Sequence, residues 1–157
     1  MTGPDGPNDP CPAQPAAPAG PVGLHHVELW VPDLGRAEES WGWLLGELGW
    51  RPGRSWGAGR TWCLGATYLV FEQSPAVSAD RHERRRPGLN HLAFWAGPPE
   101  QVDRLVTDAR HHGWSLMFPD RHPYAGGNDV YAAYLEDRDG YEVELVATAR
   151  LFPILES

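Results

Sequence analysis

The sequence predicts an α+β fold made of two copies of a βαβββ unit, and two observations carry this prediction. A stretch typical of a short strand, with a histidine near its start, occurs as LHHVELWVP at residues 24–32 and again as LNHLAFWA at residues 89–96. In each copy a helical pattern follows and ends at a Gly-Trp pair, Gly49-Trp50 in the first copy and Gly113-Trp114 in the second. The spacing between the landmarks agrees to within one residue, which indicates an internal duplication.

The elements of the first copy follow from local patterns. Side chains alternate along a strand, so the strand over 24–31 places His26, Glu28 and Trp30 on one face. Asp33 is a suitable N-cap for a helix over 35–48, and Gly49 is a suitable stop. The helix carries one apolar stripe, formed by Trp41, Leu44, Leu45 and Leu48. Three glycines at positions 53, 57 and 59 predict a loop, and strands over 60–64 and 67–73 then form a hairpin.

The second copy repeats this order. A strand over 89–96 places His91 and Trp95 on one face, and Pro99 suits the first turn of a helix over 99–112. Its apolar stripe consists of Val102, Leu105, Val106 and Ala109. Strands are predicted over 114–118, 130–136 and 141–147, with a long loop over 119–129.

These elements form one domain over residues 24–147. Module one covers 24–74 and module two covers 89–147, with a polar, proline-bounded linker at 75–88. We interpret the arginine run at 84–86 as part of a solvated connector, with anion binding as the alternative. Residues 1–23 are rich in Pro, Gly and Ala and predict a disordered tail, and residues 148–157 form a C-terminal extension.

Composition excludes several classes of protein. A net charge of -8 argues against nucleic acid or an anionic membrane as the main partner. All 13 basic residues are arginine, so neither a Schiff-base lysine nor a P-loop lysine is available. Cys11 and Cys63 do not suggest a disulfide framework, and we find neither a membrane span nor a secretory signal, so we expect a cytoplasmic protein.

The chain resembles the vicinal oxygen chelate superfamily, which includes glyoxalase I, fosfomycin-resistance proteins, bleomycin-binding resistance proteins and extradiol dioxygenases. The resemblance covers residues 24–147 and depends on HVELWV at 26–31, NHLAF at 90–94 and DRDGYEVEL at 137–145. It implies that the curved sheets of the two modules form a half-open barrel around one cavity. It also implies a homodimer, because incompletely closed sheets leave edges that a partner can cover.

By motif position the resemblance implies that His26, His91 and Glu144 coordinate one divalent ion. Two imidazoles and one carboxylate leave open positions for substrate and suit Fe, Mn, Ni or Zn. Glu142 shares a strand face with Glu144 and is the alternative ligand. Glyoxalase I usually has a fourth protein ligand on the last strand of the first unit, but here Leu69 or Val70 falls at that position, and Glu72 lies further along. This departure favours a three-ligand centre.

Other residues are candidates for chemistry or for substrate contacts. Glu28 shares the face of His26 and is either a general base or a structural hydrogen-bond partner. Tyr134 lies where fosfomycin-resistance proteins place a substrate-contacting tyrosine, and a structural hydrogen bond is the alternative. Trp30 and Trp95 are candidates for stacking on a planar ligand, with core packing expected for at least one of them. His122 and Tyr124 lie in the long loop, at the expected rim of the pocket.

The resemblance leads to two hypotheses about function. The first is a metal-dependent lyase, isomerase, dioxygenase or group transferase that acts on a small oxygen-chelating substrate. The second is a metal-free protein that sequesters an antibiotic, as bleomycin-resistance proteins do. The net negative charge and the eight tryptophans suit a cationic aromatic drug, whereas the intact set of His26, His91 and Glu144 favours the enzyme.

Overall fold

The computed structural model describes residues 22–148. The predicted tail up to residue 21, including Cys11, and the extension from residue 149 onward lie outside the described residues. Within residues 22–148, neither helix is long and apolar enough to cross a membrane.

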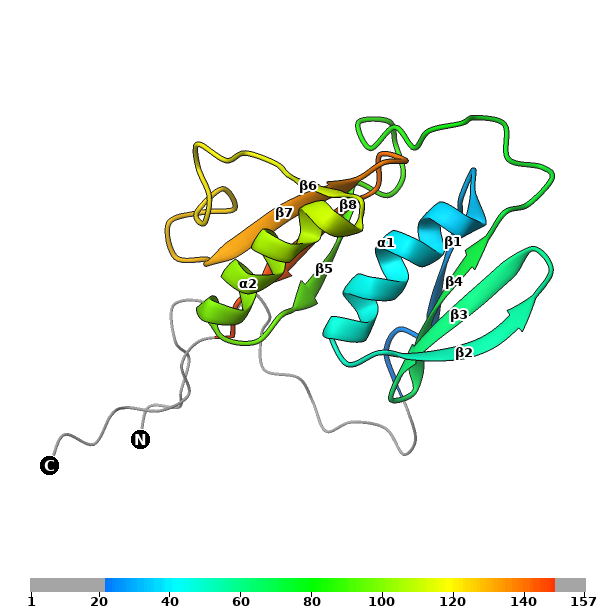
Figure 1. The fold of residues 1–157 in the computed structure, drawn as a ribbon, viewed down its shortest axis with the longest axis horizontal. Helices are drawn as coiled ribbons and strands as arrows, with labels where there is room; N and C mark the ends of the chain where they lie inside the picture. Colours follow the sequence, from blue (N-terminus) through cyan, green and yellow to red (C-terminus); the bar gives the residue numbers. More distant parts are fainter. Residues whose placement is uncertain (1–21, 149–157) are drawn as a thin grey trace, which may run out of the picture.

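The two predicted βαβββ modules are present, and their sheets have equivalent strand orders (Figure 1). Module one consists of β1 (His26–Trp30), α1 (Leu34–Glu47), β2 (Arg51–Trp56), β3 (Gly59–Leu64) and β4 (Thr67–Glu72). Module two consists of β5 (His91–Trp95), α2 (Pro99–Ala109), the short 3₁₀ helix η1 (Arg110–His112), β6 (Trp114–Leu116), β7 (Ala132–Asp137) and β8 (Glu142–Val146). The sheets run β1-β4-β3-β2 and β5-β8-β7-β6, so each first strand stands at the end of its own sheet.

Helix α1 begins at its predicted cap, and both helical segments stop before the predicted glycines. The Asp33 carboxylate accepts a hydrogen bond from the backbone N–H of Arg36 at 2.8 Å, which caps α1. Gly49 and Gly113 both have φ of 83°, a left-handed conformation that glycine adopts without steric cost. The predicted helix over 99–112 is α-helical only to Ala109, and its last turn is the 3₁₀ helix η1.

The predicted loop at the three glycines is wrong for Gly53, which lies inside β2, and for Gly59, which begins β3. The strand is irregular there, because its register against β3 shifts between Pro52 and Ser55. Such a shift is typical of a β-bulge, where glycine is common. Only Gly57 and Ala58 form the turn to β3.

One hydrophobic core spans both modules, between the helices and one face of each sheet. The face of α1 that carries Trp41, Leu44 and Leu45 is buried, as predicted. Tryptophan is divided between interior and surface: Trp41, Trp62 and Trp114 are buried, whereas Trp30, Trp56 and Trp95 are exposed. The expectation that at least one of Trp30 and Trp95 packs in the core is therefore wrong.

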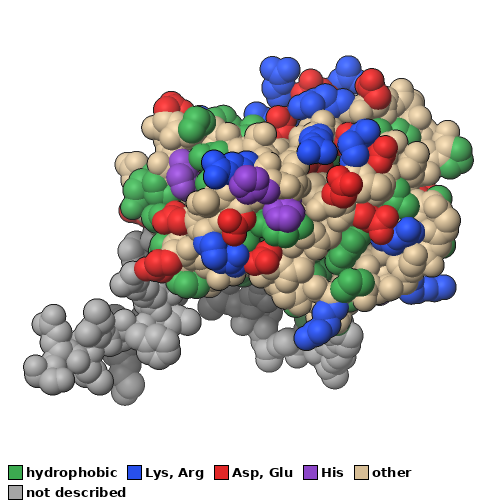
Figure 2. Space-filling view, viewed as in Figure 1, with side chains coloured by type: hydrophobic (Ala, Val, Ile, Leu, Met, Phe, Trp, Pro, Cys, Tyr) green, Lys and Arg blue, Asp and Glu red, His purple; other side chains and the backbone are tan. Residues whose placement is uncertain are grey.

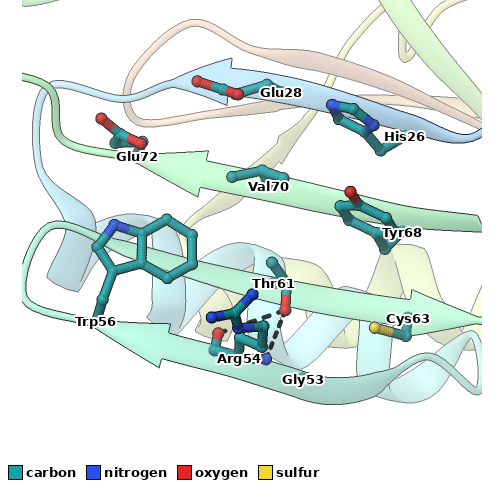
Figure 3. Close-up of a pocket in the computed structure, with 10 residues that line it drawn as sticks. All are labelled: His26, Glu28, Gly53, Arg54, Trp56, Thr61, Cys63, Tyr68, Val70 and Glu72. Atoms are coloured by element: carbon teal, nitrogen blue, oxygen red, sulfur yellow. Dashed lines mark hydrogen bonds between the residues drawn. The ribbon is translucent and has the colours of Figure 1, made fainter.

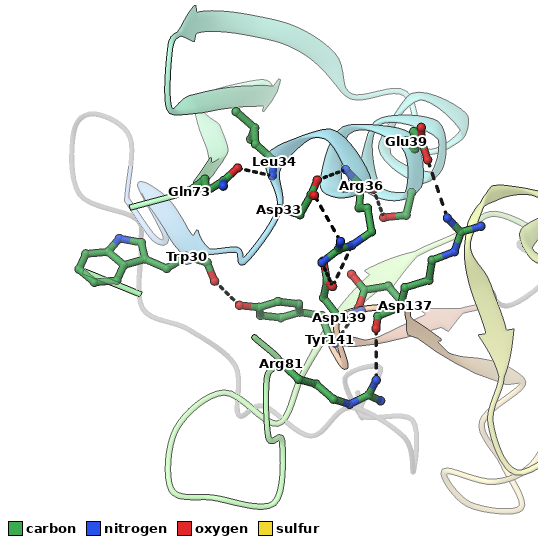
Figure 4. A network of polar contacts seen from close by, with 12 residues as sticks. Trp30, Asp33, Leu34, Arg36, Glu39, Gln73, Arg81, Asp137, Asp139 and Tyr141 are labelled. Carbon is green, nitrogen blue, oxygen red and sulfur yellow. Dashed lines mark hydrogen bonds and ion pairs between the residues drawn. The ribbon is translucent and has the colours of Figure 1, made fainter. Parts of the chain in front are cut away.

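Polar contacts fasten module one to module two (Figure 4). The Arg36 guanidinium pairs with Asp139 at 2.8 Å, and the Tyr141 hydroxyl donates a hydrogen bond to the carbonyl of Trp30. The Trp41 indole N–H donates to the buried Asp137 carboxylate at 2.9 Å. On the face shown in Figure 2, basic and acidic side chains are interspersed.

The linker is not merely a solvated connector, and that interpretation is wrong for Arg84. Its side chain is only 25% exposed and lies 2.9 Å from the Glu142 carboxylate on β8. Arg81 likewise pairs with Glu136 on β7 at 3.2 Å. Arg85 and Arg86 fit the prediction, since both are exposed, and among the described residues Arg85 pairs only with its neighbour in sequence, Glu83.

Candidate metal centre

Two of the three predicted ligands meet on the sheet of module two. His91 on β5 and Glu144 on β8 belong to neighbouring parallel strands, and the His91 Nε2 lies 3.3 Å from the Glu144 Oε2. The Glu144 side chain is largely buried, whereas that of His91 is about a third exposed. The pair is thus partly screened from water and open on the side of the imidazole.

A hydrogen bond to a further residue orients each member of this pair. The Asn90 side-chain oxygen lies 2.8 Å from the His91 Nδ1, so Nδ1 donates and Nε2 is directed at Glu144. The Tyr134 hydroxyl donates to the Glu144 Oε1 at 2.7 Å, leaving Oε2 for His91. Burial and the hydrogen bond to Glu144 raise the pKa of Tyr134, so the phenol stays protonated as a donor.

This arrangement fits a bound cation. When Nδ1 carries the proton, Nε2 and Oε2 are both acceptors, and their approach requires a proton or a metal ion between them. Two ligand atoms about 2.1 Å from one ion and at right angles lie about 3 Å apart, close to the 3.3 Å observed. Metal-binding histidines characteristically donate their other N–H to an oxygen, as His91 does to Asn90.

Gly126, in the loop before β7, lies against Tyr134 and Glu144. A Cβ atom at Gly126 would lie 2.5 Å from the Tyr134 hydroxyl and 3.4 Å from the Glu144 Oε1. Any larger residue would therefore displace the hydroxyl that orients Glu144. In the sequence, the only sign of this close approach is the glycine pair at 126–127 in the predicted long loop.

Glu142, the alternative ligand, is engaged elsewhere. It is 4% exposed and its Oε2 lies against the Arg84 guanidinium. Burial raises the pKa of its carboxyl group, with Arg84 acting in the opposite direction. The geometry thus pairs Glu142 with Arg84 and Glu144 with His91.

His26 lies on the other sheet. Its ring stacks on Tyr68 with centroids 4.9 Å apart, and its Nδ1 lies 2.9 Å from the Nδ1 of His25. It lines a cavity of about 670 Å³ on the sheet of module one, together with Glu28 (Figure 3). Among residues 22–148, no three His, Cys, Asp or Glu side chains are close enough to hold a metal ion, so a single chain does not gather His26, His91 and Glu144.

The remaining predicted residues occupy different surroundings. Glu28 accepts a hydrogen bond from the Trp30 indole at 2.8 Å and faces the cavity. Trp95 is 71% exposed. His122 and Tyr124 both contact Tyr131, and the His122 Nε2 lies 3.9 Å from Asp103 of α2.

The cavity also contains residues that sequence reasoning missed. They are Gly53, Arg54, Trp56, Thr61, Cys63 and Tyr68. Strand alternation could have placed Thr61 and Cys63 on one face, but the irregular strand β2 hides the direction of Arg54. The positions considered for a fourth ligand are apolar: Leu69 is buried in the core and Val70 lines the cavity, as does Glu72 further along.

Comparisons with known proteins agree with this architecture. Residues 25–134 match the family described as the glyoxalase/bleomycin resistance protein/dioxygenase superfamily. The protein YqjT of Bacillus subtilis is 43% identical over 126 residues, which cover 79% of this chain and 98% of YqjT. A crystal structure of a candidate glyoxalase from Bacillus halodurans is also 43% identical, with a TM-score of 0.75 over 80% of this chain and 95% of that one.

A more distant structure shares the fold. The fosfomycin resistance protein FosX of Listeria monocytogenes, solved with Mn(II) and sulfate, has a TM-score of 0.56 and 18% identity over 83% of this chain and 94% of its own.

Proposed function

Because the chain belongs to the glyoxalase/bleomycin resistance protein/dioxygenase superfamily, we propose that it is a divalent-metal-dependent enzyme acting on a small substrate through two neighbouring oxygens. The ion is held by His91 and Glu144 of one chain and by His26 of a second copy. The observation that carries this proposal is the His91–Glu144 pair, whose ligand atoms lie 3.3 Å apart and are oriented by Asn90 and Tyr134.

A divalent Fe, Mn, Ni or Zn ion held by these three ligand residues would act as a Lewis acid: the two substrate oxygens would chelate it, and it would stabilise negative charge on them. FosX, which shares the fold, was solved with Mn(II). The three protein ligands leave positions for the substrate oxygens.

The two-chain arrangement follows from where the ligands lie. His26 belongs to the sheet of module one, whereas His91 and Glu144 belong to the sheet of module two. The strands that carry the histidines, β1 and β5, are end strands of those sheets, and the exposed Trp95 lies on β5. A two-fold dimer that sets β1 of each chain near β5 of the other completes two equal centres and covers these edges.

The residues around the ion have distinct tasks in this proposal. Tyr134 fixes the Glu144 carboxylate through its hydroxyl. Glu28 faces the cavity beside His26 and is oriented by the Trp30 indole, so it is placed to accept a proton from a bound substrate. Lyase, isomerase, dioxygenase and group-transfer reactions all use a centre of this kind.

A second candidate function is sequestration of an aromatic antibiotic without metal. The cavity on the sheet of module one favours it, since about 670 Å³ lined by Trp56, Tyr68 and Val70 accommodates a drug-sized ligand without an ion. The orientation of His91 and Glu144 by two further residues favours the enzyme instead, because a sequestering pocket does not require it.

Elemental analysis of tag-free protein tests the proposal, before and after chelation and refilling with Fe, Mn, Ni or Zn. We expect about one ion per chain, and its loss in the variants His26→Ala, His91→Ala and Glu144→Ala with the fold retained. His122→Ala is the matched control, because this histidine contacts α2 and should leave the metal content unchanged.

Full metal occupancy in His91→Ala would contradict the assignment. Absence of any rebindable ion in the wild type would favour sequestration, which a titration of aromatic antibiotics against the tryptophan fluorescence would then test.

A further inference from the structure

We infer that Arg54 binds an anionic group of the substrate, and that the substrate is a flat molecule with a carboxylate at the end opposite its chelating oxygens. This inference rests on the proposed function, because it assigns the substrate class of that site. Four features of the cavity carry it: the irregular strand β2, the close approach of Gly53, the unpaired guanidinium of Arg54 and the fixed ring of Trp56.

The irregularity of β2 is anchored at Arg54. The register against β3 shifts between Pro52 and Ser55. The Thr61 hydroxyl accepts a hydrogen bond from the Arg54 backbone N–H at 2.7 Å and donates one to the Arg54 carbonyl at 3.4 Å. A β-bulge commonly redirects one side chain near a functional site, and here the side chain of Arg54 lines the cavity (Figure 3).

Gly53 permits this geometry. A Cβ atom at that position would lie 2.5 Å from the Thr61 Oγ1 and 2.9 Å from the Cys63 Sγ. With any other residue at position 53, either the Thr61 and Cys63 side chains or the strand β2 would have to shift. The two hydrogen bonds with Thr61 thus fix the backbone of Arg54.

The positive charge of Arg54 is available to a ligand. Among residues 22–148, most arginines pair with a carboxylate: Arg36, Arg60, Arg81, Arg84, Arg85, Arg104 and Arg138. No carboxylate of the described chain lies within 4.0 Å of the Arg54 guanidinium, although Glu28 and Glu72 line the same cavity. In Figure 3, Val70 lies between Glu28 and the position of Arg54.

Trp56 forms a fixed wall beside this charge. A Cβ atom at Gly59 would lie 2.1 Å from the Trp56 ring, so the indole packs directly on the glycine. An indole held in this way offers a flat apolar surface to a planar ligand.

The positions of the strands set the length of the substrate. His26 is on β1 and Arg54 on β2, the two outer strands of the sheet. Three strand spacings amount to about 14 Å across the sheet. Arg54 also lies further along the sheet, because the register joins His26 through Tyr68 and Cys63 to Arg51. Both side chains reach into the cavity, which leaves on the order of 10 Å between the chelating oxygens and the carboxylate.

Two catechol probes test the inference. 3-(3,4-Dihydroxyphenyl)propanoate carries chelating oxygens, a flat ring and a carboxylate, and 4-ethylcatechol lacks only the charged group. Their dissociation constants are measured by calorimetry with wild type, Arg54→Gln and Arg51→Gln, each with Mn-loaded and with chelator-treated protein. Arg51 is the matched control, because it lies on the same strand and is exposed but does not line the cavity.

We expect the wild type and Arg51→Gln to bind the carboxylate probe about tenfold more tightly than the neutral one, and Arg54→Gln to lose this preference. The preference tests Arg54, whereas the effect of chelation on both probes tests the metal centre, so the two can fail separately. An unchanged preference in Arg54→Gln, equal binding of both probes by the wild type, or no binding of either would overturn the inference.

Discussion

Replacing Tyr134 by phenylalanine removes one hydroxyl and tests how Glu144, the proposed metal ligand, is held. The hydroxyl donates to the Glu144 Oε1 at 2.7 Å and is half-buried, so its loss frees a largely buried carboxylate to rotate. Removing a hydrogen-bond partner of a metal ligand typically lowers metal affinity about 10- to 100-fold. At about 1.4 kcal/mol per factor of ten, this is about 1.4–2.8 kcal/mol.

The assay is competition for Mn(II) between the protein and a fluorescent chelator of known affinity. Tyr131→Phe is the matched control, because the Tyr131 hydroxyl donates to the Asp103 carboxylate at 2.7 Å at the exposed surface of α2. The control removes the same chemical group from a similar bond and should leave metal affinity unchanged. Equal affinities for wild type, Tyr134→Phe and Tyr131→Phe would refute the reasoning.

Three further predictions follow from individual contacts. Gly126→Ala should lower metal affinity in the same competition assay, because its Cβ would displace the Tyr134 hydroxyl; unchanged affinity would contradict this. Trp41→Phe should lower the free energy of unfolding in urea by about 1–3 kcal/mol, because the buried Asp137 carboxylate loses the indole N–H; no change would show that this bond is dispensable. Burial raises the pKa of Glu142 above its ordinary value of 4.5, so above that pH the folded chain retains a proton that the unfolded chain releases. Wild-type stability should therefore fall as the pH rises from 4.5 through the raised pKa. The non-titrating Glu142→Gln should show a smaller fall in unfolding measurements, with the remainder due to Asp137, whose pKa burial also raises; equal falls in both proteins would contradict this.

Much of the fold could be predicted because its signals are local. A histidine near the start of each first strand and a Gly-Trp pair after each helix marked both modules, and Gly49 and Gly113 adopt the expected left-handed conformation. The bulge at Gly53 could not be predicted in this way. The close approach of this position to Thr61 and Cys63 on the next strand is a contact between strands, and the glycine by itself indicates only a loop.

The same distinction holds for the candidate site: local patterns predicted some of its features, and contacts between distant segments determine the others. The alternation of side chains along a strand predicted which faces His91 and Glu144 occupy. It did not predict the hydrogen bond that His91 donates to Asn90 or the one that Glu144 accepts from Tyr134. The insertion of Arg84 beside Glu142 depends on the path of the linker, which has no periodic pattern. The separation of His26 from the other two ligands depends on how the two sheets are placed, and periodicity within each module carries no information about that.

The measurement that tests the shared centre most directly is the metal content of a mixture of His26→Ala and His91→Ala chains. Each variant alone should bind no stoichiometric ion. In a two-fold dimer with ligands from both chains, a mixed pair contains one intact centre and one doubly damaged centre. Random exchange makes about half of the dimers mixed, so the mixture should recover about a quarter of an ion per chain. No recovery after proven exchange of subunits, or a full complement of metal in monomeric wild type, would contradict the account.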